Sequence, residues 1–160
     1  MVKVLIIYDS KTGNTEEMAK AIAEGIKEAK AEVDVKKAQD TSLEDMEKAD
    51  ALILGSPTHF GTMSEKMKKL ISDSVKIRGK LEGKIGAAFT SSHAIAGGNE
   101  TTLMSLIQAM LIHGMVIVGD PLEVGGHYGV VAIGKPNAET LTACKALGER
   151  VAELAAKIAG

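Results

Sequence analysis

The feature that most constrains the fold of this chain is a regular alternation of short apolar runs with longer segments of helical periodicity. The first run, VKVLIIY at residues 2–8, is rich in β-branched and aromatic residues and nearly continuous, as expected for a strand buried on both faces. Four similar runs follow, at residues 32–36, 51–55, 84–91 and 115–119. The glycine-rich stretch after them indicates one further short strand at residues 130–133.

Between these runs, apolar residues recur at spacings of three and four, which is typical of amphipathic helices. The pattern predicts helices at residues 15–29, 42–49, 64–74, 101–113 and from 137 onward. We expect Asn14 to cap the first helix, with Glu17 completing a capping box. Asn137 is the expected cap of the last helix. The inward residues expected for that helix are Leu141, Cys144, Leu147, Val151, Leu154 and Ile158.

Five strand–helix pairs without a repeat or a low-complexity linker predict a fold of the α/β class. We expect residues 1–160 to form a single doubly wound domain with a five-stranded parallel sheet. Ligands of such folds bind beyond the carboxyl ends of the strands. The clusters of Gly, Ser, Thr and Pro fall at that edge, in residues 9–15, 55–62, 91–99 and 119–129.

Composition excludes several classes of function. The chain has 19 Lys and Arg against 21 Asp and Glu, so its net charge of −2 does not favour nucleic acid or an anionic membrane surface. No apolar run approaches the ~20 residues that a membrane-spanning helix needs. The single cysteine, Cys144, excludes an internal disulfide and a cysteine-built metal site. We therefore predict a cytoplasmic protein without a bound metal.

The first loop, SKTGNT, lies between a strand and a helix. Its hydroxyl groups, its glycine and the free N–H groups of the helix start suit a phosphate group, and Lys11 adds a positive charge. The alternative is a well-capped turn, which the same residues favour. The loop is not a Walker sequence, and no G-x-G occurs in the chain. The candidate phosphate ligands are Ser10, Lys11, Thr12, Gly13, Asn14 and Thr15.

The second loop, GSPTHFGT, and the third, SSHAIAGGN, could hold a planar ring between them. A ring would lie against His59 or Phe60, with backbone groups at its polar edge. Core packing is the alternative for Phe60. Neither loop contains Lys or Arg.

These motifs resemble a known family. SKTGNT matches the [ST]-x-T-G-N-T phosphate loop of flavodoxins, and GSPTHFGTMSEKMKKL is similar to the flavin-ring loop of the WrbA-type NAD(P)H:quinone oxidoreductases. AGGNETT and HGMVIV are similar to segments of the same group, and the resemblance runs from residue 2 to about 134. It implies a flavodoxin-like fold with one FMN, whose phosphate the first loop would hold.

The resemblance also assigns residues to the flavin ring. On one side it places Pro57, Thr58, His59, Phe60 and Gly61, and on the other Ser91, Ser92, His93 and Gly98. His113 matches a histidine near the flavin in the oxidoreductases; the alternative is a histidine at a helix C-terminus. No residue is predicted to be catalytic, because FMN would carry the chemistry.

The resemblance leaves two functions open. The first is a small electron carrier that exchanges electrons with redox proteins such as ferredoxin-type donors or acceptors. The second is an FMN-dependent NAD(P)H:quinone oxidoreductase, with NAD(P)H and quinones as partners. The quinone oxidoreductases carry a tryptophan after the ring-loop helix and a longer insertion after the second strand. Here SDSVKIRGKLEG has no aromatic residue and the insertion is missing, which favours the carrier. Assembly into a homo-oligomer stays open.

Two further hypotheses concern charge. A phospho-receiver domain of the same fold is excluded, because it needs paired acids after the first strand and this chain has only Asp9. An acidic cluster, Glu44, Asp45, Glu47 and Asp50, is interpreted either as a steering patch for a basic redox partner or as an ordinary solvated surface.

Overall fold

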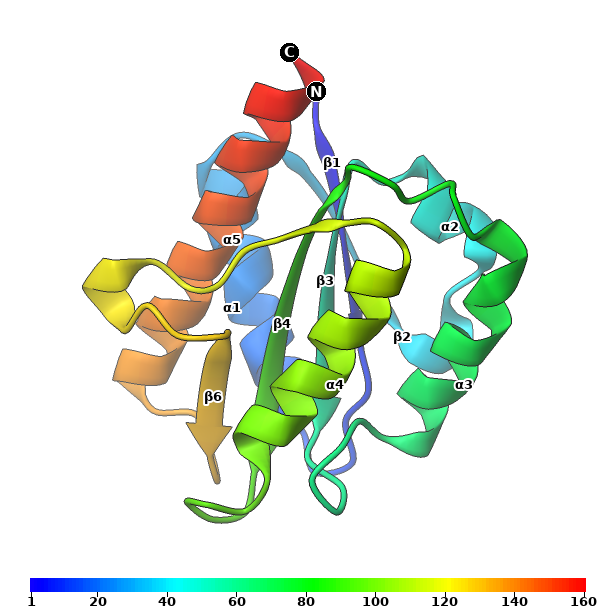
Figure 1. Ribbon diagram of the computed structural model, residues 1–160. Helices are drawn as coiled ribbons and strands as arrows, with labels where there is room; N and C mark the ends of the chain where they lie inside the picture. The colour runs from blue at the N-terminus through cyan, green and yellow to red at the C-terminus, as the bar shows by residue number, and fades with distance from the viewer.

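The computed structural model describes all residues 1–160 and shows a parallel sheet between two layers of helices (Figure 1). The strands are β1 (Lys3–Tyr8), β2 (Glu32–Lys37), β3 (Ala51–Pro57), β4 (Ile85–Ser92), β5 (Val116–Ile117) and β6 (Val130–Ile133). Their order is β2-β1-β3-β4-β5, and β6 also pairs with β4. The predicted doubly wound parallel fold is confirmed.

The fifth position of the sheet is shared by two short strands. Val116 pairs with Ile85 at the start of β4, and Val130 pairs with Phe89 further along the same edge. The predicted strand at 115–119 is therefore only two residues long, and the predicted short strand at 130–133 continues its path. The interruption has a visible cause, because Arg150 takes the carbonyls of Gly119 and Asp120 as hydrogen-bond acceptors, at 3.0 and 3.1 Å.

The helices cover both faces of the sheet. They are α1 (Asn14–Glu28), α2 (Leu43–Lys48), α3 (Glu65–Asp73), α4 (Asn99–Ile112) and α5 (Ala138–Ala159), with short 3₁₀ turns at Ala38–Asp40, Ser74–Ile77 and Leu122–Val124. Helices α1 and α5 pack on one face, and α2, α3 and α4 on the other, so each face has its own apolar core. None of the helices has the length and hydropathy that a membrane-spanning segment requires.

Helices α1 and α5 approach each other closely. A Cβ added to Gly25 would overlap the backbone carbonyl of Lys145, and one added to Gly148 would overlap that of Ile22. Each helix thus presses its backbone against a glycine of the other. Cys144 lies fully buried beside this contact, as predicted, whereas Ile158 near the end of α5 is exposed, contrary to expectation, because the helix there extends past the sheet core.

The predicted cap of α1 is wrong. The N-cap is Gly13, in the left-handed region at φ 96°, and Asn14 is already the first helical residue. No side chain caps this helix. The expected cap at Asn137 is confirmed, because its side chain accepts a hydrogen bond from the N–H of Thr140 at 2.8 Å.

Candidate functional site

The first loop forms an open cradle of backbone donors at the carboxyl end of β1. Ser10 Oγ accepts from the N–H of Gly13 at 3.1 Å, which folds the loop back on itself. The N–H groups of Lys11, Thr12, Asn14, Thr15 and Glu16 have no acceptor within the chain. A Cβ on Gly13 would meet nothing within 4 Å, so space lies directly before these donors.

The N-termini of the five α-helices differ in whether a side chain caps them. Helices α2, α3 and α5 are each capped by a side chain, that of Ser42, Ser64 or Asn137. Helices α1 and α4 are not, and each follows a left-handed glycine, Gly13 or Gly98. Uncapped N-termini present free N–H groups and the positive end of the helix dipole. The two open N-termini follow the first and third predicted loops.

The second loop ends in a tight turn at His59–Thr62. The N–H of His59 donates to the carbonyl of Thr62 at 3.0 Å, and the N–H of Thr62 donates back at 3.1 Å. Phe60 and Gly61 both have positive φ, 50° and 77°, as in a type I′ turn. Positive φ is unfavourable for phenylalanine, by about 1–2 kcal/mol. The Phe60 side chain is fully exposed, so the core-packing alternative is wrong.

Contacts between the loops bring the predicted residues together. Thr15 Oγ1 and Ser91 Oγ are 2.8 Å apart in a buried hydrogen bond that joins the first and third loops. The N–H of Thr58 donates to the carbonyl of Ser91, also at 2.8 Å. Gly98 packs so closely that a Cβ there would lie 2.6 Å from Gly61 Cα. The three loops therefore form one continuous surface.

Three polar residues that the sequence did not assign to the site support this surface. Asp9 is buried and accepts from the N–H of Ser10 at 2.9 Å. Thr90 is buried, donates to the carbonyl of Ser56 at 2.6 Å and lies 3.0 Å from the Thr58 hydroxyl. Asn99 donates to Ser92 Oγ at 2.9 Å. The run of hydroxyl residues that ends β4 could have indicated Thr90, because a polar residue in an otherwise apolar strand needs a partner.

Tyr8, at the end of β1, orients the first turn of α1. Its hydroxyl donates to Glu16 Oε1 at 2.8 Å. Burial, followed by this hydrogen bond, raises the pKa of Tyr8 to about 12. The same bond lowers the pKa of Glu16, which favours the ionised carboxylate as the partner of the Tyr8 hydroxyl.

His113 is the predicted site residue that the structure keeps apart from the others. It follows the last residue of α4, about 20 Å of helix away from the third loop. Its Nε2 lies 2.8 Å from Ser74 Oγ, which itself donates to the carbonyl of Ile71, so Nε2 carries the proton. Nδ1 is buried without a partner. Burial, and then the charge of Arg78, lower the pKa of His113, which favours the neutral ring.

A cavity of about 530 Å³ lies beside the third loop, against β6. The fourth predicted cluster, residues 119–129, forms one wall of it, rather than part of the cradle. Asp120 is buried there and accepts from the N–H groups of Gly126 and His127 at 3.1 and 3.0 Å. The walls are otherwise largely apolar and include Ile95, Leu103, Tyr128 and Val130.

The residues present fit a phosphate-bearing planar ligand. The free N–H groups of the first loop and the unpaired hydroxyl of Thr12 are donors, as a phosphate dianion requires. The second and third loops, which contain no Lys or Arg, provide backbone groups and hydroxyls for a ring.

Comparison with known proteins gives the family. The sequence model of the flavodoxin family matches residues 6–160. An NAD(P)H dehydrogenase (quinone) of Archaeoglobus fulgidus is 40% identical to this chain, in an alignment that covers 99% of this chain and 100% of the relative. The alignment spans 190 positions, whereas this chain has 160 residues, so about 30 positions of the relative have no counterpart here. A flavodoxin of Aquifex aeolicus is 41% identical over 96% of this chain and 86% of its own length.

Solved structures agree with the sequence comparison. A flavodoxin from the domain Archaea superposes with a TM-score of 0.83 at 30% identity, covering 97% of this chain and 99% of that one. A WrbA-like flavodoxin from Agrobacterium tumefaciens gives 0.82 at 28% identity, covering 98% and 99%. With its parallel sheet, its open first loop and these relatives, the chain belongs to the flavodoxin family.

Proposed function

We propose that this protein binds FMN at the carboxyl edge of its sheet and carries electrons between larger redox proteins. When bound, FMN supplies the redox chemistry, because its ring accepts and releases electrons one at a time. The protein's part is to hold the cofactor, shield it and present its edge. The phosphate ligands would be the N–H groups and hydroxyls of residues 10–15, and the ring would lie between residues 57–61 and 91–98.

The observation that carries this proposal is the pair of uncapped helix N-termini at Gly13 and Gly98. In this chain the other three α-helices satisfy their first N–H groups with their own side chains. Placing a glycine instead of a capping side chain at two of five N-termini costs helix stability, about a few tenths of a kcal/mol for each. An anionic ligand would offset that cost by accepting the free hydrogen bonds.

Two features support a carrier rather than an enzyme. The ring loop is exposed at its tip, where Phe60 points into solvent, so a protein partner could reach the ring edge directly. The stretch after α3 has no aromatic residue, where the resemblance to the quinone oxidoreductases implies a tryptophan. The chain also lacks roughly 30 positions that the Archaeoglobus quinone dehydrogenase has in addition. The absence of Lys and Arg from both ring loops disfavours negative charge on the reduced ring, as suits a donor of low potential.

A second candidate function is an NAD(P)H:quinone oxidoreductase. The cavity of about 530 Å³ favours it, because Ile95 and Ala96 of the third loop line this cavity and a flat substrate could therefore bind next to the ring. Tyr128 could stack on such a substrate. Relatives that are named NAD(P)H dehydrogenase (quinone) support the same alternative.

Reduction of the FMN-loaded protein separates these functions. NADH or NADPH is added without oxygen while the flavin absorbance is followed. No bleaching with either nucleotide, but stepwise reduction by reduced ferredoxin, is the expected result for a carrier. Rapid bleaching followed by reoxidation with benzoquinone would establish the oxidoreductase instead. A protein that binds no flavin would refute both.

The variant Thr12→Ala tests the cradle itself. Its hydroxyl has no partner within the chain, so the substitution should leave the unfolding midpoint of the FMN-free protein unchanged. Loss of a hydrogen bond to a charged group costs about 1.5–3 kcal/mol, so FMN affinity, measured by quenching of flavin fluorescence, should fall roughly ten- to a hundredfold. The matched control is Thr142→Ala on α5, which should bind FMN normally.

The unpaired Cys144 supports a cytoplasmic location, as we also propose.

A further inference from the structure

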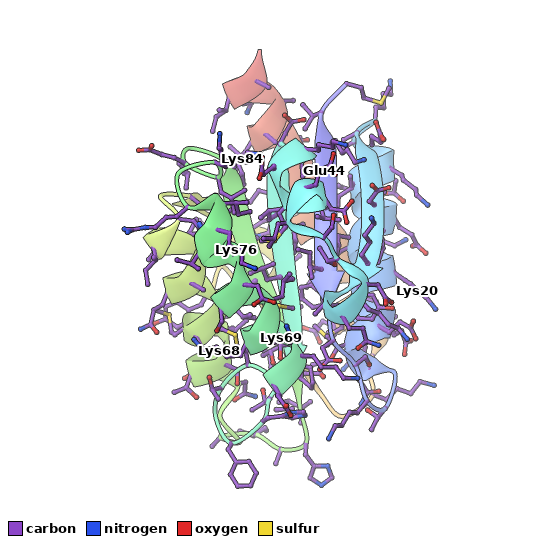
Figure 2. The ribbon with its side chains drawn as sticks, turned by 90° about the vertical axis from the view of Figure 1, so that its right-hand side faces the viewer. Lys20, Glu44, Lys68, Lys69, Lys76 and Lys84 are labelled. Atoms are coloured by element: carbon purple, nitrogen blue, oxygen red, sulfur yellow. The ribbon has the colours of Figure 1, made fainter.

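One surface of the molecule carries charge that the overall composition hides. Residues 65–84 hold seven of the 19 basic residues and only three of the 21 acidic ones, an excess of four positive charges in a chain of net charge −2. The cations are Lys66, Lys68, Lys69, Lys76, Arg78, Lys80 and Lys84. Figure 2 looks onto this face and shows Lys68, Lys69 and Lys76 along α3 and the turn that follows it. We call it the α3 basic face.

Most of these cations are free. Lys69 pairs with Asp73 at 2.9 Å, and Lys84 donates to the backbone carbonyls of Glu47 and Ala49. The other five are exposed and make no ion pair: Lys66, Lys68, Lys76, Arg78 and Lys80. The three acids of the segment are Glu65, Asp73 and Glu82, so Glu65 and Glu82 are the only uncompensated negative charges among them.

The acidic cluster of Glu44, Asp45, Glu47 and Asp50, on and just after α2, differs because most of its charges are paired. Asp45 pairs with Lys36 at 2.8 Å and completes a capping box with Ser42. The hydrogen bond from Lys36, followed by those from Ser42, lowers the pKa of Asp45 to about 2. Glu44 pairs with Lys48, and Asp50 accepts from the N–H of Lys3. These carboxylates are mostly engaged within the molecule, so the steering patch for a basic partner is the weaker of the two hypotheses for them.

Fold stability does not explain the α3 basic face. Helix α3 begins at Glu65, which places Lys66, Lys68 and Lys69 in its first two turns. Lys66, in the first turn, opposes the positive end of the helix dipole, at a typical cost of about 0.3–1 kcal/mol. Lys66 and Lys69 also repel each other at a spacing of three residues. Charges that weaken the helix they belong to indicate a selection for something outside the fold.

The position of the α3 basic face, next to the ring loop, indicates a role in binding a partner. Helix α3 follows directly on the ring loop, whose tip at Phe60 is exposed, so the lysines border the proposed route of electrons. We propose that the α3 basic face docks an acidic electron-transfer protein and steers its redox centre to the ring edge. This inference rests on the proposed carrier function. The face has no aromatic residue for stacking on bases, and the chain as a whole is negative, so a nucleic acid is disfavoured.

A titration with an acidic [2Fe–2S] ferredoxin tests the docking. Amide signals of the ¹⁵N-labelled protein, with and without FMN, are followed at low ionic strength. The expected result is a set of shifts confined to residues 58–80 that disappears in 1 M NaCl, because exposed charges are screened within about 3 Å at that salt concentration. The test variant combines Lys66→Gln, Lys68→Gln and Lys76→Gln. Electrostatic steering is worth ten- to a thousandfold in association rate, so this variant should lose at least about tenfold in affinity and in electron-transfer rate.

The matched control combines Lys27→Gln, Lys30→Gln and Lys157→Gln, three exposed lysines outside the face that make no ion pair. It should behave as the parent protein. Equal loss in both triple variants, shifts on α2, or stronger shifts with a U15 oligonucleotide or phosphatidylserine vesicles would overturn the proposal. FMN affinity should be the same in all three proteins. Failure to bind FMN would refute the carrier function, whereas the titration of the FMN-free protein would still test the surface.

Discussion

Substituting the two left-handed glycines that precede α1 and α4 measures how tightly the loops of the site are joined. Gly13 and Gly98 have nearly the same backbone conformation, with φ of 96° and 100°. An alanine at either position pays about 1–2 kcal/mol for the left-handed region. Their surroundings differ: a Cβ at 13 meets nothing within 4 Å, whereas one at 98 would lie 2.6 Å from Gly61 Cα and 3.1 Å from Gly61 N.

The contact at Gly98 determines how much more Gly98→Ala should destabilise the protein than Gly13→Ala. Carbon atoms in contact are normally about 3.5–4.0 Å apart, so the new methyl group would overlap the Gly61 backbone by about 1 Å. Backbone atoms of a hydrogen-bonded turn cannot rotate away as a flexible side chain can, so the second loop has to move. Overpacking of this kind adds about 1–3 kcal/mol. We expect Gly98→Ala to destabilise by about 2–5 kcal/mol in total and Gly13→Ala by about 1–2.

Urea unfolding of the FMN-free protein measures this difference without the ligand. With a slope of about 2 kcal/mol per molar, the midpoint of Gly98→Ala should lie roughly 0.5–1.5 M below that of Gly13→Ala. The slope itself should be the same in both variants. Equal midpoints would mean that the loops are free to separate, and the continuous surface inferred from the Thr15, Thr58 and Gly98 contacts would be refuted.

Three further predictions concern groups outside the cradle. Burial, and then Arg78, lower the pKa of His113 in the folded protein, so its contribution to stability is complete above the ordinary histidine pKa and is lost as the pH falls from there through the folded pKa. The variant His113→Asn should therefore show a flatter dependence of unfolding free energy on pH between 7.5 and 5.5. Parallel curves for the variant and the parent would contradict the buried neutral ring. Burial raises the pKa of Cys144 to about 12, so a thiol reagent such as dithionitrobenzoate should modify native protein at pH 8 only as fast as it unfolds, and immediate modification would show an accessible thiolate. Ser42→Ala removes the capping box of α2 and should lower the unfolding free energy by about 1 kcal/mol; a midpoint identical to the parent's would show that α2 contributes nothing to global stability.

The strands and helices were predictable because burial and periodicity are local properties of the sequence. Strand β1 is a nearly continuous apolar run, and β4 is apolar up to its last three residues, which carry hydroxyl groups. The start of β1 and both ends of β4 differ from the predicted bounds by one residue. The cap of α1 was not predictable from residue type, because Asn14 is as good a cap as Gly13 in isolation. The left-handed conformation of Gly13 moves the helix start back by one residue and leaves its N–H groups free.

The split of the fifth strand depends on a partner distant in sequence. Arg150, on the last helix, holds the carbonyls of Gly119 and Asp120, and nothing near residue 119 indicates that contact. For the same reason, motif similarity assigned His113 to the flavin, although the length of α4 keeps it away from the loops of its own chain. The free cations of α3 were also hidden, because a net charge of −2 averages over opposite faces.

The reciprocal glycine contact between α1 and α5 has a consequence for the synthesis of the protein. The phosphate loop lies at the start of α1, yet α1 rests on a helix whose last residues are made some 130 positions later. At roughly 5–20 residues per second, a ribosome needs about 7–26 s to cover that distance. During this interval the nascent chain displays its cradle sequence without the helix that supports it. Capture of the cofactor should therefore wait for release of the finished chain, and a chain truncated before residue 138 should fail to bind flavin even though every residue of the first three loops is present.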